Sequence, residues 1–381
     1  MWKYVLLFKI LIIKGEIEVN NCLGIINLDE DVRDMGELVK KRNLAAVPIA
    51  ARYRVIDFIL SNMKNSDVES IGIFVETKAR ALVDHLKNGR PWDLHRKNGL
   101  KVFNFSDEDL TFDDVHSFAE DMEYIKNSKK EYVLLAPSYM ICNINYREIL
   151  DEHKKSGNDV TLIYKNVSTA NEYFINCDVL EINEDRKLVS VEKNTGNKAN
   201  CNISMEMYIM STELFIDIIL KSIKGGLYRK VKTFINENLD KLNVKCYEYK
   251  GYLACVNSLK AYYNVNMELL NQEVNEELFG KDRPIVTKTK DEAPTLYTSD
   301  SEISNSIIAN GCYIEGEVKN SIIGRRVHIH KGCKIENSII LQESDINKNS
   351  RLSKVITDKG CVVEEFECFI GRNDQPVVLG K

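Results

Sequence analysis

Short apolar runs alternate with helical patterns from about residue 23 to residue 270. The runs at 71–75, 132–136 and 160–164 are rich in β-branched and aromatic residues, as buried parallel strands require. Between them, 79–86 and 146–153 carry apolar residues at helical spacing. Strands separated by such helices form right-handed crossovers and a parallel sheet covered on both faces. The pattern therefore predicts an α/β domain over residues 20–272.

A repeated word replaces this alternation in the last part of the chain. Asn-Ser-Ile-Ile occurs at 305–308, 320–323 and 337–340, and Ser-Lys-Val-Ile at 353–356 is a looser copy, so the spacings are 15, 17 and 16. An aliphatic residue about every sixth position, with glycine or asparagine at corners, suits a triangular parallel β-helix, because each coil has three short faces. We predict a β-helix domain at 297–381, with about four coils over 301–371. A sandwich of alternating strands is the alternative, but sandwiches do not repeat a four-residue word.

Two further segments complete this organisation. Residues 273–296 are charged and weakly periodic and include Pro294, so we interpret them as a linker. Residues 1–19 form an N-terminal extension whose apolar stretch is too short to span a bilayer and has no signal-peptide cleavage site. Lys14-Gly15-Glu16 has purine-rich codons that can contain a ribosome-binding sequence. Val19, a few codons later, can be encoded by a GTG start, so we expect the true chain to start at or near Val19. The alternative is that these residues form a surface strand.

Composition narrows the class of partner. The 381 residues include 52 Lys+Arg and 57 Asp+Glu, for a net charge of −5. A mildly acidic chain lacks the basic excess that binding to a phosphate backbone requires, so small molecules and proteins are the expected partners, not nucleic acid. Ten cysteines are scattered singly without a Cys-x-x-Cys pair, which gives zinc knuckles no support and fits a reducing cytoplasm.

Four words in the α/β domain resemble one enzyme family. They are Ala-Val-Pro at 46–48, Arg-Tyr-Arg-Val-Ile-Asp-Phe at 52–58, Leu-Ser-Asn at 60–62 and Pro-Trp-Asp-Leu at 91–94. With the two-domain plan, they are similar to bacterial ADP-glucose pyrophosphorylase, the glucose-1-phosphate adenylyltransferase of glycogen synthesis. The resemblance runs from about residue 21 to residue 371. It implies a Rossmann-like, GT-A-like nucleotidyltransferase domain followed by a left-handed parallel β-helix of hexapeptide-repeat type.

The positions that hold this family's chemistry carry other residues here. The family has a GGxGxR loop for the triphosphate after the first strand, whereas this chain has Asp29, Glu30 and Asp31 there, and their charge opposes a polyanion. The family holds magnesium between two aspartates, and the matching positions are Tyr139 and Cys255. Neither position offers an anionic oxygen.

Other positions on the nucleotide side differ as well. The lysine of the family's KPAVP word is Leu44 here, and its GTAxA segment matches Asp-Val-His-Ser-Phe at 114–118. The resemblance therefore implies no catalytic residue, no metal site and no cofactor in this chain alone.

On the sugar side of the site, this chain retains more of the family's residues than on the nucleotide side. Glu192 and Lys193 stand where the family's EKP word holds a lysine that pairs with the hexose phosphate, and Ser204 and Tyr208 match its SMGIY word. A lysine beside a glutamate suits a phosphate monoester. Glu206, however, replaces a glycine and would crowd or repel the ligand. The resemblance implies a residual sugar-phosphate site, with a solvated surface ion pair as the alternative.

A chain that keeps the fold but lacks the residues for nucleotide and metal binding resembles the GlgD-type subunit of this family. Assembly and allostery depend on the surfaces of the fold, whereas catalysis depends on a few charged residues at defined positions. The resemblance thus implies a regulatory, weakly or non-catalytic, cytoplasmic subunit in a hetero-tetramer with the catalytic ADP-glucose pyrophosphorylase subunit, which would hold the magnesium. We expect the partner contact on the β-helix aliphatics, such as Ile322, Ile323, Ile339 and Ile340, although most of these side chains should fill the coil interior.

Two enzyme interpretations stay open. Pyrophosphorylase activity would survive if Asp29, Asp31 or Asp57 supplied substitute metal ligands, although the ordinary role of Asp57 is a hydrogen bond at a helix start. Asn143 would replace one lost ligand but not both.

The second enzyme interpretation is acyl transfer. Hexapeptide-repeat coils also serve acyl-coenzyme A transferases, which use a histidine base. His328 and His330 are two residues apart and so point to the same side of a strand. Ordinary surface histidines are the alternative.

Overall fold

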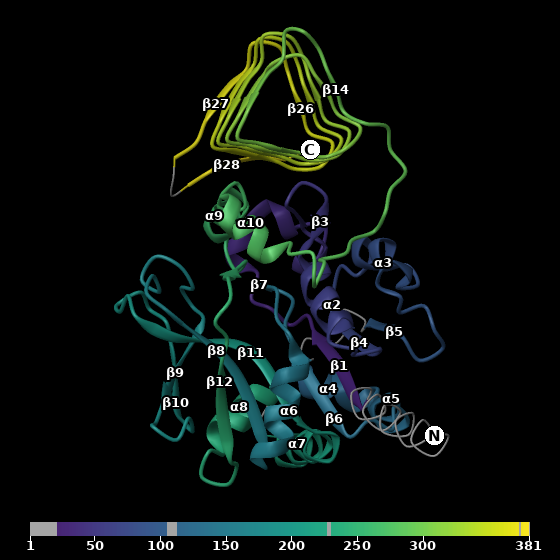
Figure 1. Ribbon diagram of the computed structural model, residues 1–381, viewed down its shortest axis with the longest axis vertical. Helices are drawn as coiled ribbons and strands as arrows, with labels where there is room; N and C mark the ends of the chain where they lie inside the picture. Colours follow the sequence, from purple (N-terminus) through teal and green to yellow (C-terminus); the bar gives the residue numbers. More distant parts are fainter. Residues whose placement is uncertain (1–20, 105–112, 227–229, 373–374, 381) are drawn as a thin grey trace, which may run out of the picture.

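The computed structural model describes residues 21–104, 113–226, 230–372 and 375–380. A β-helix stands at the end of the α/β domain that carries β3, α9 and α10 (Figure 1). The expected start at Val19 lies outside the described residues. Among the helices formed by the described residues, none has the length and apolar character needed to cross a membrane.

A mixed sheet forms the centre of the α/β domain. Its strands follow the order β10-β9-β11-β6-β1-β4-β5, and β8 and β12 extend it beside β11. The strands are β1 Cys22–Asn27, β4 Ser70–Val75, β5 Leu100–Asn104, β6 Tyr132–Ala136, β8 Val160–Val167, β9 Asp178–Ile182, β10 Leu188–Lys193, β11 Cys201–Ser211 and β12 Val244–Glu248. Two short pairs lie beside this sheet: β2 Pro48–Ile49 with β3 Tyr53–Arg54, and β7 Met140–Cys142 with β13 Leu253–Cys255.

The three predicted strands are present as β4, β6 and β8, but the prediction of a parallel sheet is wrong in part. Strands β6, β1, β4 and β5 are parallel, whereas β11 runs antiparallel between β6 and β8. No helix separates β8 from β11 along the chain, because antiparallel strands need no helical crossover. The alternation of strands and helices is therefore interrupted between β8 and β11, and it resumes with α7, α8 and β12.

Helices cover both faces of the sheet. Leu23 and Ile25 of β1 pack into one apolar core, and Cys22 and Ile26 pack into the other. The α-helices are α2 Val55–Asn65, α3 Arg80–Leu86, α4 Asp114–Glu120, α5 Met122–Asn127, α6 Tyr146–Ser156, α7 Thr212–Gly225, α8 Val231–Glu237, α9 Leu259–Glu268 and α10 Gln272–Leu278, and the 3-10 helices are Arg33–Val39, Leu44–Ala46 and Arg90–Trp92. The two predicted helices correspond to α3 and α6, and α10 occupies the first part of segment 273–296.

The C-terminal domain is a left-handed parallel β-helix of hexapeptide repeats. Three sheets of five parallel strands stack in five coils, seen as nested triangles in Figure 1. The strands are β14 Leu296–Tyr297, β15 Glu302–Ser304, β16 Ile307–Ile308, β17 Tyr313–Ile314, β18 Glu317–Lys319, β19 Ile322–Ile323, β20 His328–Ile329, β21 Lys334–Glu336, β22 Ile339–Ile340, β23 Asp345–Ile346, β24 Arg351–Ser353, β25 Val355–Thr357, β26 Val362–Val363, β27 Cys368–Ile370 and β28 Val377–Leu379.

The prediction of about four coils over 301–371 was one coil short, because β14 and β28 lie outside that range. The fourth copy of the repeat is also shifted by one residue. Ile339 pairs with Ile356, 17 residues later, so this copy begins at Lys354. Asn337 and Lys354 share the corner backbone conformation, with φ of 46° and 55°. The predicted start of this copy was one residue too early because lysine replaces the asparagine that favours this left-handed conformation.

The repeated isoleucines have two separate roles. The first isoleucine of each word packs against the α/β domain, as Ile322 and Ile339 do, and the second, as at Ile323 and Ile340, fills the β-helix interior. All four side chains are at most 1% exposed. The expectation that they contact a partner subunit is therefore wrong, because this chain buries them itself.

Polar contacts fix the same joint between the domains. The Tyr263 hydroxyl of α9 donates to the carbonyl oxygen of Asn337 at 2.7 Å. The Arg42 guanidinium contacts both carboxylate oxygens of Asp358 at 2.7 and 2.8 Å, and both side chains are nearly buried. Apolar packing and directed hydrogen bonds together hold the β-helix in one orientation.

Candidate functional site

A cavity of about 500 Å³ lies beside the carboxyl ends of β1 and β6. In open α/β sheets this edge is the usual place for ligands, because loops from several strands meet there. Among the predicted residues, Leu44, Tyr139, Lys193 and Tyr208 line the cavity. The described part of the chain thus brings together residues from the nucleotide, metal and sugar sides of the implied site.

The two positions that match the family's metal ligands are neighbours. Strands β7 and β13 pair with Cys255 opposite Met140, and the Val256 amide donates to the carbonyl oxygen of Tyr139 at 2.9 Å. The Cys255 sulfur lies 3.5 Å from the sulfur of Cys177. Burial is the main cause that raises the pKa of both Tyr139 and Cys255, so both side chains stay neutral. A neutral phenol and a neutral thiol do not fit magnesium, which takes hard oxygen ligands.

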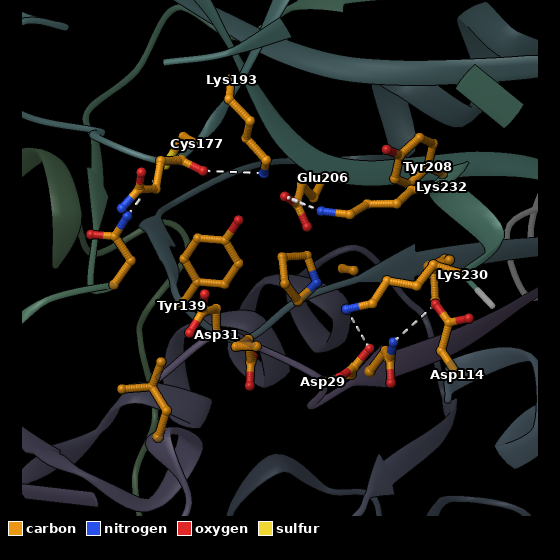
Figure 2. A pocket seen from close by; sticks show the side chains of 18 of the residues that line it. Asp29, Asp31, Asp114, Tyr139, Cys177, Lys193, Glu206, Tyr208, Lys230 and Lys232 are labelled. Carbon is orange, nitrogen blue, oxygen red and sulfur yellow. Dashed lines mark hydrogen bonds and ion pairs between the residues drawn. The ribbon is translucent and has the colours of Figure 1, made fainter. Parts of the chain in front are cut away.

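A lysine ammonium lies in this part of the cavity. Lys232 Nζ is 2.7 Å from Glu206 Oε1 (Figure 2). It also lies 3.3 Å from Asp178 Oδ2. Burial alone would lower the pKa of Lys232, but the charges of Glu206 and Asp178 outweigh it and raise the pKa. Lys193 Nζ also pairs with Asp178, at 2.6 Å. The site therefore holds permanent cations that are already compensated by carboxylates.

Glu206 occupies a backbone conformation that favours glycine. Its φ is 53°, at a bulge where the register of β11 against β8 shifts between Ser204 and Met207. The Glu206 amide donates to the Ser204 hydroxyl at 3.1 Å, which stabilises the bulge. Ser204 is 1% exposed, and neither it nor the exposed Glu192 lines the cavity. A non-glycine residue with this φ costs about 1 kcal/mol, which the Lys232 ion pair offsets.

The acidic residues after β1 are individually paired. Asp29 Oδ2 lies 2.7 Å from Lys230 Nζ, and Asp31 Oδ1 accepts a hydrogen bond from Arg33 Nε at 2.9 Å. Glu30 accepts hydrogen bonds from the amide and hydroxyl of Ser138 at 2.8 and 2.6 Å. Because each carboxylate already has a partner, this segment does not form a free set of metal ligands.

Gly24, the glycine that remains in this stretch, lies inside β1. A Cβ atom there would be 2.8 Å from the sulfur of Met63, so the glycine serves close packing against α2 rather than approach to a phosphate.

Two other proposed substitute ligands lie away from the cavity. Asp57 accepts from the Arg54 amide at 2.8 Å and contacts His85 Nε2 at 2.6 Å, which confirms its predicted hydrogen bond at the start of α2. The Asn143 side-chain amide donates to the carbonyl oxygens of Leu278 and Arg283, at 2.9 Å each. Both residues therefore support the fold.

Comparison with known proteins identifies both domains. Residues 37–272 match the nucleotidyl transferase family model, and residues 293–376 match the model of the GlmU-like, C-terminal hexapeptide. The chain is 35% identical to the glycogen biosynthesis protein GlgD of Bacillus subtilis (strain 168) over 366 residues, which cover 95% of this chain and 96% of that protein. The chain belongs to the GlgD family.

Other relatives agree with this assignment. GlgD of Geobacillus stearothermophilus is 37% identical over 83% of each chain. The glucose-1-phosphate adenylyltransferase of Mycoplasma mobile is 31% identical over 78% of this chain and 80% of that protein. These relationships to GlgD and to the adenylyltransferase support a role in glycogen biosynthesis.

Sequence reasoning missed several charged residues of this GlgD-family cavity. Lys230 and Lys232 lie at the start of α8. Asp114, which the resemblance placed only within the nucleotide-side segment 114–118, accepts a hydrogen bond from the Val231 amide at 3.1 Å. Two lysines at alternate positions are common on protein surfaces, so nothing in the sequence marks them as cavity residues. Their contacts with Asp29 and Glu206 span long sequence separations and depend on the fold.

Proposed function

We propose that this GlgD-family chain is a regulatory, weakly or non-catalytic subunit of glucose-1-phosphate adenylyltransferase and works in the cytoplasm. The observation that carries the proposal is the Lys232–Glu206 pair, which lines the cavity together with the neutral side chain of Tyr139. The neutral thiol of Cys255 does not line the cavity but contacts Cys177, which does. A fixed ammonium repels a magnesium ion, and the nearby carboxylate is already neutralised. Catalysis that depends on a metal therefore belongs to a partner subunit, which makes ADP-glucose and pyrophosphate from ATP and glucose 1-phosphate.

The alternative of an active nucleotidyltransferase with substitute ligands has weaker support. Asp29 and Asp31 are paired with Lys230 and Arg33, and Asp57 is engaged by His85. Using Asp29 or Asp31 as a metal ligand would require breaking its ion pair first. The segment also lacks the glycines that let a phosphate approach the backbone amides of a glycine-rich loop.

We propose that the partner is the catalytic subunit, in a hetero-tetramer, and that the contact uses the last coil of the β-helix. Val362, Phe366 and Ile370 are 57%, 72% and 64% exposed there. Val362 and Ile370 lie on two different faces of this coil, on β26 and β27. Large exposed apolar side chains are typical of protein–protein contacts. These residues replace the buried isoleucines as the expected contact.

The sugar-phosphate site remains a second proposal. Lys193 and Tyr208 line the cavity next to Lys232, and lysine ammoniums bind phosphate monoesters. A ligand phosphate would compete with Asp178 for Lys193 and with Glu206 for Lys232, since these carboxylates lie within ion-pair distance. We therefore expect weak binding of glucose 1-phosphate.

The decisive experiment compares the catalytic subunit alone, this chain alone and the two together, with ATP, glucose 1-phosphate and magnesium, while effectors are titrated. We expect the mixture to differ from the sum of the two rates in maximal rate or in effector response. A Phe366→Asp/Ile370→Asp variant should lose this effect, whereas Val189→Asp, whose side chain is 49% exposed on β10, should keep it. Simple addition of the rates would contradict the regulatory role, and turnover by this chain alone at the rate of a catalytic subunit would favour the enzyme interpretation.

A further inference from the structure

A cluster of histidines and carboxylates lies on the outer face of one β-helix sheet, remote from the cavity. Parallel pairing aligns Tyr313, His328 and Asp345 on β17, β20 and β23, and the neighbouring row of Ile314, Ile329 and Ile346 is fully buried in the interior. Side chains alternate between the two faces of a strand. The row at Glu315 and His330 therefore returns to the outer face.

Contacts between these side chains are close. The rings of His328 and His330 stack with centroids 3.6 Å apart. Glu315 Oε2 lies 3.4 Å from His328 Nε2 and 3.9 Å from His330 Nδ1. Taking one ligand atom from each of the three residues, all lie within 4.8 Å of one another. All three side chains are partly exposed, so an ion can reach them from solvent.

We propose that Glu315, His328 and His330 bind a divalent transition-metal ion, with Zn²⁺ as the type. In a tetrahedral zinc site with bonds of about 2.0–2.1 Å, neighbouring ligand atoms are about 3.3–3.4 Å apart. The contact between Glu315 and His328 already has this length, and the contact between Glu315 and His330 exceeds it by about half an ångström. Because a metal ion binds in the plane of each imidazole ring, the two stacked rings must also rotate apart to face one ion, which other staggered rotamers of these partly exposed side chains allow. Two imidazole nitrogens select zinc, nickel or copper over magnesium and calcium.

Asp345 supports the site from the other side. Its Oδ1 lies 2.9 Å from His330 Nε2, the ring nitrogen opposite to the one that faces Glu315. A carboxylate that accepts the far N–H of a ligating histidine fixes the ring and raises its basicity, as in many zinc sites. Glu315 and Asp345 place two carboxyl groups beside the two histidines, and a dication bound there would compensate their charge.

The ligands lie on adjacent coils, so a bound ion would clamp β17 to β20. The backbone positions are set by the ladder pairing of Tyr313 with His328 and of Ile314 with Ile329. Because these strands are rigid, little order is lost when an ion binds. This reasoning concerns the β-helix alone and does not depend on the proposed regulatory function.

Zinc titration calorimetry on the full chain tests the proposal. The protein is first dialysed against EDTA and carries Cys368→Ser, because Cys368 is the exposed thiol among the cysteines of the structure. We expect one Zn²⁺ per chain, and the His328→Asn/His330→Asn variant should bind it at least about tenfold more weakly. Glu315→Gln should weaken binding while both imidazoles remain. The matched control is His116→Asn, which alters an exposed histidine that pairs with Asp113 on another domain.

Thermal unfolding separates loss of a site from loss of the fold. Without metal, the variants should unfold at the temperature of the parent. When Zn²⁺ is added, the parent and the His116→Asn control should gain more stability than Glu315→Gln, and the double histidine variant should gain the least. Replacement of Zn²⁺ by Co²⁺ should give visible absorption of a nitrogen- and oxygen-ligated ion in the parent and the His116→Asn control. Equal zinc affinity in the parent and the double histidine variant, or no binding by the parent, would overturn the proposal.

Discussion

The joint between the two domains and the cavity of the α/β domain are built from opposite kinds of chemistry. At the joint, one column of the β-helix presents Ile322, Ile339 and Ile356, all nearly buried, to the α/β core. In the cavity, by contrast, charged side chains such as Lys232 and Glu206 pair across half-buried space. Apolar packing depends on volume and pattern, whereas a charged site depends on a few individual atoms. A chain can therefore exchange its site chemistry and leave its scaffold unchanged.

The largest expected effect is at the joint. Ile339→Ala removes a side chain that is 1% exposed from a core shared by both domains, so it should lower the free energy of unfolding by about 2–5 kcal/mol. Urea denaturation followed by circular dichroism measures this change. Ile370→Ala is the matched control, because its side chain is 64% exposed on the last coil and should cost at most about 0.5 kcal/mol.

Similar values for these two variants would mean that the joint contributes little to folding. In that case apolar packing at the joint would not be what stabilises the scaffold. A core shared by both domains should make them unfold in one transition, so two separate transitions would show that the domains unfold independently.

Sequence patterns predicted the scaffold far better than the cavity. The Asn-Ser-Ile-Ile word identified the β-helix because every coil must repeat the same corner and the same inward residue. It slipped by one residue at Lys354, where the asparagine is replaced. Strand β11 was missed because a long antiparallel strand follows a hairpin instead of a helix.

The cavity could be predicted only in part. Tyr139 and Lys193 were found because the resemblance supplied their positions, and both line the cavity. The Lys232 ion pairs were not found, because Glu206 and Asp178 lie 26 and 54 residues away in sequence. Contacts between charged residues follow from the fold and have no local signal in the chain.

The second effect concerns the charged half of the comparison. Lys232→Met leaves Glu206 and Asp178 without this ammonium in partly buried positions and should cost about 1–3 kcal/mol of unfolding free energy. A double-mutant cycle with Glu206→Gln should recover part of that loss, because the uncompensated charge is then gone. Lys221→Met, which breaks an exposed pair with Asp217 on α7, should change stability by at most about 0.5 kcal/mol.

The same variants test the proposed anion site. Lys232→Met should also abolish weak binding of glucose 1-phosphate in a calorimetric titration, whereas Glu206→Gln should strengthen it, because the ligand no longer competes with a carboxylate. A cycle with no coupling between Lys232 and Glu206 would show that the pair is not formed in solution.

The smallest effect is a pH dependence that arises at Glu30. Burial is the main cause that raises the pKa of Glu30 from 4.5 to about 7. Between these two values the folded state binds more protons than the unfolded state, so the free energy of unfolding falls as pH rises through this window. Because the side chain is partly exposed, we expect a loss of only about 1 kcal/mol between pH 5 and pH 8. Glu30→Gln keeps an oxygen that can accept from Ser138 and should remove this part of the slope.

Urea denaturation at several pH values between 5 and 8 measures the difference between the parent and Glu30→Gln. Asp31→Asn is the control, because Arg33 lowers the pKa of Asp31 to about 2 and the group stays ionised over the whole range. Its stability should therefore follow the pH dependence of the parent. Parallel curves for the parent and Glu30→Gln would show that the Glu30 carboxylate is solvated, and the acidic segment would then be an ordinary surface turn rather than a partly dehydrated wall of the cavity.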